Sequence, residues 1–308
     1  MTQNQLYDAL LDALYATFGR HPGFRVAHAK GVLVQGTFVA SPEAKRLSRA
    51  PHFQGGVVPV VLRFSNFSGI PSTVDGDPTA SPHGLAIRFT LPDGKTTDIV
   101  SHSFNGFPVA TPEEFLSFLR GIAAAGGDQA NPAQLGAFLS SHPRAKAFIE
   151  AAKPAPQSYA SLEYYGVNAF VLVNQSNQRR AVRYRIEPLI REQSPDVREI
   201  EGWEPDHLRT ELKRRLLKGP VKLRLIAQLA APGDSVTDGS EPWPETNEEV
   251  NLGLFTLSTL IPEADQDRLQ QALDFNPARL SDGIEDSGDP MIMARQRIYE
   301  RAVARRSK

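Results

Sequence analysis

Residues 24–31 read FRVAHAKG, and residues 32–39, which follow without a break, read VLVQGTFV. In the second segment Val32, Val34 and Gly36 alternate with their neighbours at a period of two, which predicts a β-strand. His28 lies immediately before this strand, at the point where the chain enters it, and side chains at such positions often reach into cavities. We therefore expect a fold built on a sheet, with His28 close to a functional site.

More strand patterns follow at short intervals. Residues 57–67 form an apolar run that suits a strand buried on both faces, and 84–91 and 97–101 read as two more strands around the turn sequence PDG at 92–94. Four strands in about seventy residues with short turns indicate an antiparallel sheet or barrel rather than a parallel sheet. The segments 165–174, 180–188, 221–229 and 254–261 continue the strand pattern.

Helical patterns surround these strands. Leu6, Leu10 and Leu14 recur every four residues and predict an amphipathic helix over 3–19. Thr111 and Pro112 supply the N-cap and first position of another helix. Further helices are expected within 132–151, 205–218, 262–273 and 291–306. No linker or repeat divides the chain, so we expect a single domain over residues 1–308, with an N-terminal helix in 1–23 and a barrel with its helical core in 24–308.

The composition narrows the possible functions. The 308 residues are 41% hydrophobic and 22% charged, which is ordinary for a soluble globular protein, and the net charge of -1 predicts no general affinity for nucleic acid or acidic membranes. The absence of cysteine excludes disulfides, thiolate catalysis and iron-sulfur clusters. No signal peptide or membrane span is visible, so a cytoplasmic location is expected.

Two further features point to a ligand. Arg63 interrupts the apolar strand at 57–67, and a buried cation needs a partner, which a carboxylate-bearing ligand could supply. Near the C-terminus, Arg295 and Tyr299 are four residues apart and therefore share one face of the last predicted helix. With His28, they suggest a buried prosthetic group between a histidine and a tyrosine.

The motifs in between resemble those of the haem catalases. Residues 62–65 (LRFS), 84–89 (GLAIRF), 98–100 (DIV) and 275–285 (FNPARLSDGIE) occur in the order and rough spacing of that family. The chain resembles a small catalase-related haem peroxidase from about Arg25 to Arg306. This resemblance implies an α+β fold, a closed antiparallel β-barrel of about eight strands with surrounding and C-terminal helices, and haem b as the cofactor.

The resemblance also implies residue roles. His28 matches the distal histidine that moves the proton of the peroxide, and Ser65 matches the serine that orients the imidazole. Tyr299 matches the tyrosine that binds iron as a phenolate, with Arg295 favouring the anion. Arg25, Arg63 and Arg306 match the arginines that hold the haem propionates, although Arg306 also suits a helix C-terminus.

Two further matches are less direct. The family carries an asparagine after the DIV motif that hydrogen-bonds the peroxide; strict spacing selects Ser103, whereas residue type selects Asn105, which is the prediction. Phe115 matches an aromatic near the haem, yet it also belongs to the apolar stripe of its helix. The other histidines form no metal-binding spacing and are interpreted as surface or loop residues: His21, His52, His83, His102, His142 and His207.

The function expected from the resemblance is a haem-dependent peroxidase that reduces hydrogen peroxide and organic hydroperoxides, with weak catalase activity also allowed. The chain is shorter than large catalases, so a more accessible pocket is expected. The partners are a peroxide and a small-molecule electron donor, and a homo-oligomer is left open. Two alternatives remain: a haem-binding carrier or sensor, and a hydroperoxide isomerase of the allene oxide synthase kind. Ala27 disfavours the isomerase, which resembles this family but carries threonine before its histidine.

Overall fold

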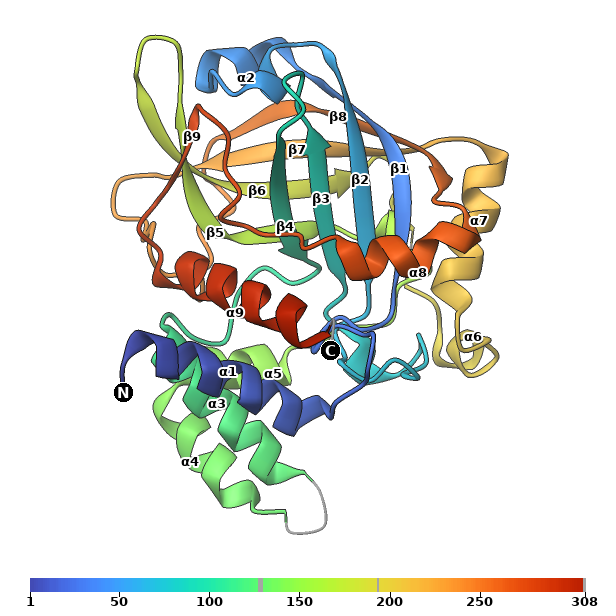
Figure 1. Ribbon diagram of the computed structural model, residues 1–308, viewed down its shortest axis with the longest axis vertical. Helices are drawn as coiled ribbons and strands as arrows, with labels where there is room; N and C mark the ends of the chain where they lie inside the picture. Colours follow the sequence, from blue (N-terminus) through green and yellow to red (C-terminus); the bar gives the residue numbers. More distant parts are fainter. Residues whose placement is uncertain (127–129, 193, 307–308) are drawn as a thin grey trace.

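The predicted barrel is present. The computed structural model describes residues 1–126, 130–192 and 194–306, and within them the antiparallel strands follow the order β4-β3-β2-β1-β8-β7-β6-β5-β9 (Figure 1). β4 also pairs with β5, at His102 and Tyr165, so β1 to β8 close on themselves and β9 extends β5. The strands are β1 Gly31–Ala40, β2 Val57–Ser65, β3 Gly84–Thr90, β4 Thr96–His102, β5 Tyr164–Val173, β6 Arg179–Pro188, β7 Val221–Leu229, β8 Glu249–Leu260 and β9 Ile284–Asp286.

Aromatic side chains fill the interior of the barrel. The ring centroid of Phe38 lies 5.3 Å from that of Phe89 and 4.8 Å from that of Phe255, and all three side chains are fully buried. Because successive residues of a strand face opposite sides, Leu62 and Phe64 point into this core while Arg63 and Ser65 point to the outer face of the sheet. The polar residues of β2 therefore belong to a site outside the barrel.

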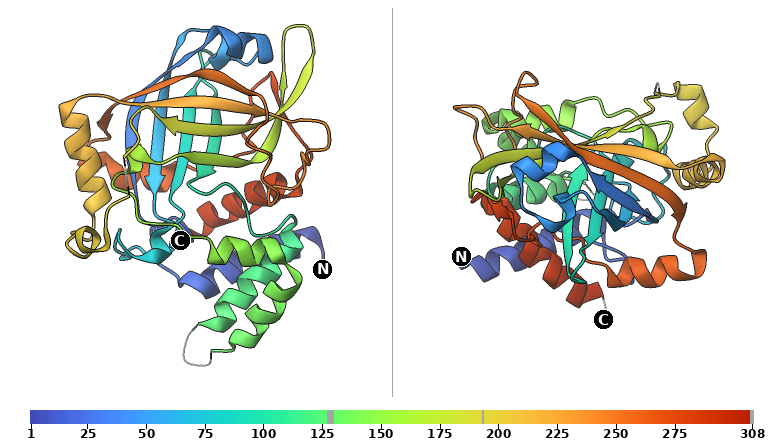
Figure 2. Two further views of the ribbon diagram at one scale, coloured as in Figure 1. Left: turned by 180° about the vertical axis from the view of Figure 1, so that it is seen from behind. Right: turned by 90° about the horizontal axis from the view of Figure 1, so that it is seen from above.

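The helices lie around and below the barrel. Figure 1 shows α9 between the barrel and a layer made of α1, α3, α4 and α5, and Figure 2 shows the same arrangement from behind and from above. The helices are α1 Gln3–Phe18, α2 Pro42–Leu47, α3 Pro112–Ala125, α4 Pro132–Ser141, α5 Pro143–Glu150, α6 Val197–Glu201, α7 His207–Lys218, α8 Glu263–Ala272 and α9 Pro290–Arg306. None of the helices in the described ranges is long and apolar enough to span a membrane.

Local sequence explains why α3 and α9 begin where they do. The side chain of Thr111 caps α3 by accepting a hydrogen bond from the backbone nitrogen of Glu114, and the carboxylate of Glu114 accepts one from the backbone nitrogen of Thr111. The carboxylate of Asp289 accepts from the backbone nitrogen of Met291 in the first turn of α9, 2.8 Å away. This fixes the start of the helix that carries Arg295 and Tyr299.

Most predicted elements are confirmed, and the differences concern short segments. The short helices α2 and α6 and the three-residue strand β9 were not predicted, and β8 begins at Glu249, five residues before the predicted start at 254. The interpretation of the spare histidines as surface or loop residues is wrong for His52, which lies in a short 3-10 helix and is 1% exposed. His83 does lie in a loop, directly before β3, but it is equally buried.

Candidate active site

The outer face of β2, β3 and β4 forms one wall of a cavity. In the register of these strands Arg63 pairs with Ala86 and Ala86 with Val100, while two residues further along Ser65 pairs with Gly84 and Gly84 with His102. Residues opposite one another on adjacent strands point to the same face. The wall therefore presents polar side chains at its margins and small residues, Ala86 and Gly84, at its centre.

His28 is held firmly against this wall. Its backbone has a φ of 56°, a left-handed conformation that is uncommon for histidine. Two backbone contacts maintain it: the nitrogen donates to the carbonyl oxygen of Phe67 at 2.9 Å, and the carbonyl oxygen accepts from Nη2 of Arg63 at 2.9 Å. Nδ1 of the ring lies 3.1 Å from Oγ of Ser65. The other ring nitrogen, Nε2, remains for a molecule in the cavity.

Gly84 makes room for the imidazole of His28. A Cβ at this position would lie 2.8 Å from Nδ1 of His28 and 2.7 Å from Oγ of Ser65, and both distances are shorter than a Cβ atom tolerates. Burial, with a smaller contribution from the charge of Arg63, lowers the pKa of His28 to about 3. The imidazole is therefore neutral at pH 7 and able to accept a proton.

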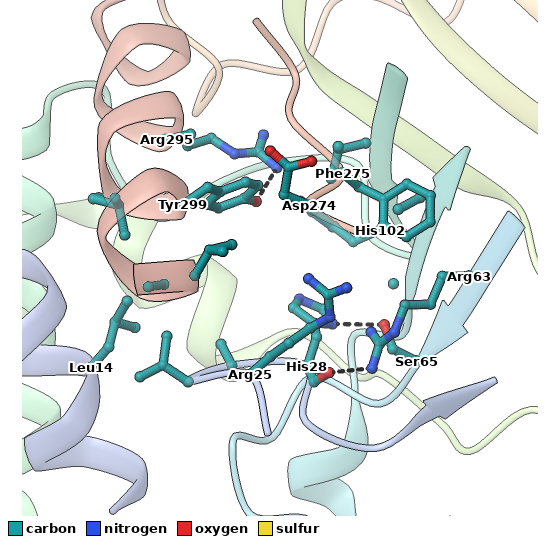
Figure 3. Close-up of a pocket in the computed structure, with 18 of the residues that line it drawn as sticks. Leu14, Arg25, His28, Arg63, Ser65, His102, Asp274, Phe275, Arg295 and Tyr299 are labelled. Carbon is teal, nitrogen blue, oxygen red and sulfur yellow. Dashed lines mark hydrogen bonds between the residues drawn. The ribbon is translucent and has the colours of Figure 1, made fainter. Parts of the chain in front are cut away.

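Across the cavity α9 presents Arg295 and Tyr299 (Figure 3). Nη2 of Arg295 donates to the phenol oxygen of Tyr299 at 3.1 Å, and Nη1 donates to Oδ1 of Asn168 at 2.6 Å. Nδ2 of Asn168 in turn donates to the buried carboxylate of Asp289 at 2.7 Å. This chain of hydrogen bonds fixes the guanidinium beside the phenol.

Three arginines also reach the cavity, and their partners are neutral. Arg63 donates to Oε1 of Gln270, and Arg25 donates to the carbonyl oxygens of Gln270 and Leu273. Arg306 donates to the carbonyl oxygen of Gln271. The backbone oxygens of this set lie in or just after the last turn of α8, where carbonyls lack helical partners and carry partial negative charge.

Among the described residues no carboxylate pairs directly with this group, because Asp274, the acidic residue of the lining that acts on Arg25 and Arg306, forms its salt bridges with Arg88 and Arg279. In the described part of the chain Arg25, Arg63 and Arg306 form no salt bridge, and Nε of Arg25 is buried without a hydrogen-bond partner. Burial and the neighbouring charge of Arg306 lower the pKa of Arg25 to about 10, and burial together with Arg25 lowers the pKa of Arg63 strongly. A cluster of this kind calls for an anionic ligand, as expected for Arg63 from the sequence.

The cavity between these walls opens to solvent. About 930 Å³ of space, open solvent included, is free of protein atoms there. Apolar residues such as Leu14, Val26 and Ile298 line it beside the polar ones. Figure 3 shows Tyr299 and Arg295 on the side of α9, and His28, Ser65 and Arg63 on the opposite side.

The structure assembles most of the residues that the sequence singled out. The lining includes Arg25, His28, Arg63, Ser65, Arg295, Tyr299 and Arg306. It does not include Phe115, which packs between the rings of Phe107 and Phe118 in the helical layer.

The two residues considered for hydrogen-bonding the peroxide also lie outside the cavity. Neither Asn105 nor Ser103 lines the cavity, and Oγ of Ser103 accepts a hydrogen bond from the backbone of His83 instead. His102, interpreted from the sequence as a surface or loop residue, lines the cavity at the end of β4. The alternation of side chains along β4 could have indicated this position, because Val100 and His102 share the outer face of the strand. The proximity of Asn168 to Arg295 had no comparable signal, because Asn168 lies in β5 and Arg295 in α9, 127 residues apart in the chain.

Groups of three or more histidine or acidic side chains that could hold a metal ion are absent from the described residues. A bound metal would therefore depend on a different ligand set. In this cavity Tyr299 offers a phenol oxygen and the arginines offer anchors for an anionic group, which together suit a metal that is carried within an organic cofactor.

Comparison with known proteins identifies similar chains. A family model described as catalase matches residues 6–307. Among curated proteins, the chain is 37% identical over 303 residues to a catalase-related peroxidase of Mycolicibacterium paratuberculosis, covering 97% of this chain and 94% of the relative. It is 33% identical over 304 residues to a catalase-related peroxidase of Synechococcus elongatus, covering 98% of this chain and 88% of the relative.

Solved structures show the same fold. A fungal catalase superposes with a TM-score of 0.81 over 93% of this chain, and catalase A from Saccharomyces cerevisiae superposes with a TM-score of 0.80 over the same share. Sequence identity is 20% in both cases. This chain covers 60% and 62% of the length of those two proteins.

Proposed function

This chain belongs to the catalase family, and from that premise we propose that it is a haem-dependent peroxidase acting on hydrogen peroxide and organic hydroperoxides. The family and its catalase-related peroxidases make it an oxidoreductase that acts on peroxide. The observation that carries the finer proposal is the opposition of two side chains. A neutral imidazole, His28, faces one side of the cavity, and the arginine-paired phenol of Tyr299 faces the other.

The residues of the cavity fit haem b. Haem is flat and largely apolar, which suits Ala86 and Val100 on the strand wall, and its two propionates would neutralise the arginine cluster. We propose Tyr299 as the iron ligand, with Arg295 placing positive charge beside the ligating oxygen, and Arg25, Arg63 and Arg306 as propionate anchors. When bound, haem supplies the iron centre at which the oxygen-oxygen bond of the peroxide is cleaved.

His28 moves the proton in this proposal. Its neutral imidazole accepts the proton of the hydroperoxide at Nε2 and returns it to the oxygen that leaves, while Ser65 holds Nδ1. Over a full turnover the hydroperoxide gains two electrons and two protons from a small-molecule donor, giving one alcohol and one water. With hydrogen peroxide both products are water.

The lining supports a broad choice of peroxide. Val26, two residues before His28 in the chain, lines the cavity with an apolar side chain that suits the alkyl group of an organic hydroperoxide, whereas hydrogen peroxide has no alkyl group to bury. We therefore propose that bulky alkyl hydroperoxides are substrates together with hydrogen peroxide.

His28→Ala tests this function. The change removes the acid-base group and leaves Tyr299 and the arginines in place, so haem should stay bound while peroxide consumption slows by about 10²- to 10⁴-fold. The measurement is the initial rate with hydrogen peroxide and with cumene hydroperoxide, at matched haem content. His142→Ala is the matched control, because His142 lies in the helical layer and does not line the cavity.

The outcomes separate an enzyme from a carrier. A slow His28→Ala protein beside an unchanged His142→Ala protein supports the peroxidase. Equal rates in wild type and His28→Ala would show that the distal base is dispensable and would favour a haem carrier or sensor. A wild type that converts the organic hydroperoxide to an isomer without consuming an electron donor would favour the isomerase.

A further inference from the structure

We propose that His102 is a second catalytic residue of the strand wall, which donates a hydrogen bond to the bound peroxide while His28 moves the proton. The proposal rests on the peroxidase function proposed above and extends it to a residue that no sequence motif singled out. His102 replaces Asn105 as the candidate for the residue that contacts the peroxide together with His28.

The register of the sheet puts His102 in the same row as the His28 site. Ser65, Gly84 and His102 pair in sequence across β2, β3 and β4. Adjacent strands are about 4.8 Å apart, so Ser65 and His102 flank a gap of about 10 Å between their backbones. Gly84 has no side chain to fill that gap, and the ring of His28 occupies it. Two imidazoles therefore border one space.

His102 has an unused ring nitrogen. Nδ1 is buried and has no hydrogen-bond partner among the described residues. Nε2 has no hydrogen-bond partner there either and is not among the fully buried atoms, so Nε2 is the nitrogen that can meet a molecule in the cavity. The backbone of His102 also closes the barrel by pairing with Tyr165, so the side chain projects from a rigid position.

The other buried histidines lack this combination. His52 also has an unpaired Nδ1, but its ring is packed against Phe53 and Phe89 at centroid distances of 4.1 and 4.7 Å, inside the barrel. The ring of His83 contacts Oδ1 of Asn66 at 3.1 Å and Oγ of Ser81 at 3.4 Å. Beside His28, His102 is the histidine that both lines the described cavity and keeps a free nitrogen.

The electrostatics define the role. Burial, then the charges of Arg295 and Lys153, lower the pKa of His102 to about 3, so its imidazole is neutral at pH 7. A neutral imidazole has one N–H donor and one acceptor nitrogen. A hydrogen bond donated from it stabilises the negative charge that develops on the peroxide as His28 removes the proton.

Two substitutions test this role. His102→Leu keeps the bulk and removes the donor, whereas His102→Asn keeps an N–H donor and cannot act as a base. The first measurement is fluoride binding to the ferric haem-loaded protein, followed by absorption, because a bound fluoride accepts the same hydrogen bond without turnover. The second is the initial rate with hydrogen peroxide. His142→Leu is the matched control, and haem content and thermal stability are recorded for each protein.

We expect His102→Leu to weaken fluoride binding and slow peroxide consumption by about 10- to 100-fold, the worth of one hydrogen bond to a charged group, and His102→Asn to stay within about threefold of wild type. Wild-type behaviour of His102→Leu in both measurements would overturn the proposal. Equal losses of fluoride affinity and rate in His102→Leu and His102→Asn would show that His102 does not act by donating a hydrogen bond. If the leucine protein fails to retain haem, His102→Ala supplies the donor-free comparison.

The two measurements separate this inference from the function on which it rests. If the wild type binds haem and fluoride but does not consume peroxide, the proposed function fails. The fluoride comparison still decides whether His102 donates to a ligand in the cavity. If Asn105→Ala weakens fluoride binding while His102→Leu does not, the second contact belongs to Asn105 and the proposal is wrong.

Discussion

At the scale of single residues, burial sets the charge of four histidines. His28, His52, His83 and His102 all have their pKa lowered to about 3, with burial as the first cause. Two of them line the cavity, where neutrality serves the chemistry proposed above. His52 and His83 lie elsewhere in the interior and make no such contact, so their neutrality concerns only the stability of the fold.

The buried His52 should make the protein sensitive to acid. Its folded pKa of about 3 lies below the ordinary value of about 6.5. The unfolded chain therefore binds a proton that the folded chain does not, and stability is lost as the pH falls from about 6.5 towards 3. At pH 5 the cost is about 2 kcal/mol. We expect His52→Phe to lose about 2 kcal/mol less than wild type between pH 7.5 and pH 5.

Urea unfolding at the two pH values measures this difference. Comparing each protein with itself removes the cost of fitting a phenylalanine into the core. His142→Phe, at a partly exposed position, is the control and should follow wild type. An equal loss of stability in wild type and His52→Phe would contradict the account of His52.

At the scale of elements, α1 supports α9 through two kinds of contact. Arg301 and Arg305 of α9 form salt bridges with Asp8 and Asp12 of α1. Below them, the fully buried Leu10 packs with Ala294 and Ile298 of α9. The side chains of Asp8 and Asp12 are 51% and 60% exposed, and exposed ion pairs contribute little, about 0 to 1 kcal/mol. The apolar contact should therefore dominate.

This ranking can be measured with two variants. The double change Asp8→Asn and Asp12→Asn should lower the free energy of unfolding by less than about 1 kcal/mol and leave haem affinity unchanged. Leu10→Ala should cost about 2 to 5 kcal/mol and weaken haem binding, because the packing beneath Tyr299 loosens. Urea unfolding and haem titration provide both readouts. A larger loss in the double variant than in Leu10→Ala would reverse the ranking.

The elements also show what the sequence could predict. Long periodic segments such as β1 and α1 were predicted within a residue or two, because their apolar pattern repeats several times. The three-residue β9 and the short helices α2 and α6 offered too few repeats to detect. His102 was missed for a different reason: spacing from the DIV motif was counted along the chain, whereas its place depends on the register of β4 against β3.

At the scale of the whole molecule, the site joins the two ends of the chain. His28 precedes the first strand and Tyr299 lies in the last helix, and the barrel and α9 bring them to one cavity (Figure 1). The family resemblance indicated this pairing from the sequence. The neutral oxygens from α8 that hold the arginines could not be predicted, because their contacts are set only when α8 packs beside β1 and β2.

The central claim is that a haem binds in this cavity with Tyr299 as its iron ligand. Titration of haem into haem-free protein, followed by absorption, tests it in wild type, Tyr299→Phe and the control Tyr7→Phe, whose ring lies on α1 outside the cavity lining. A phenyl ring offers iron no donor atom, so Tyr299→Phe should bind haem at least about 100-fold more weakly and with a different spectrum, while Tyr7→Phe matches wild type. Equal affinity and an unchanged spectrum in Tyr299→Phe would contradict the claim.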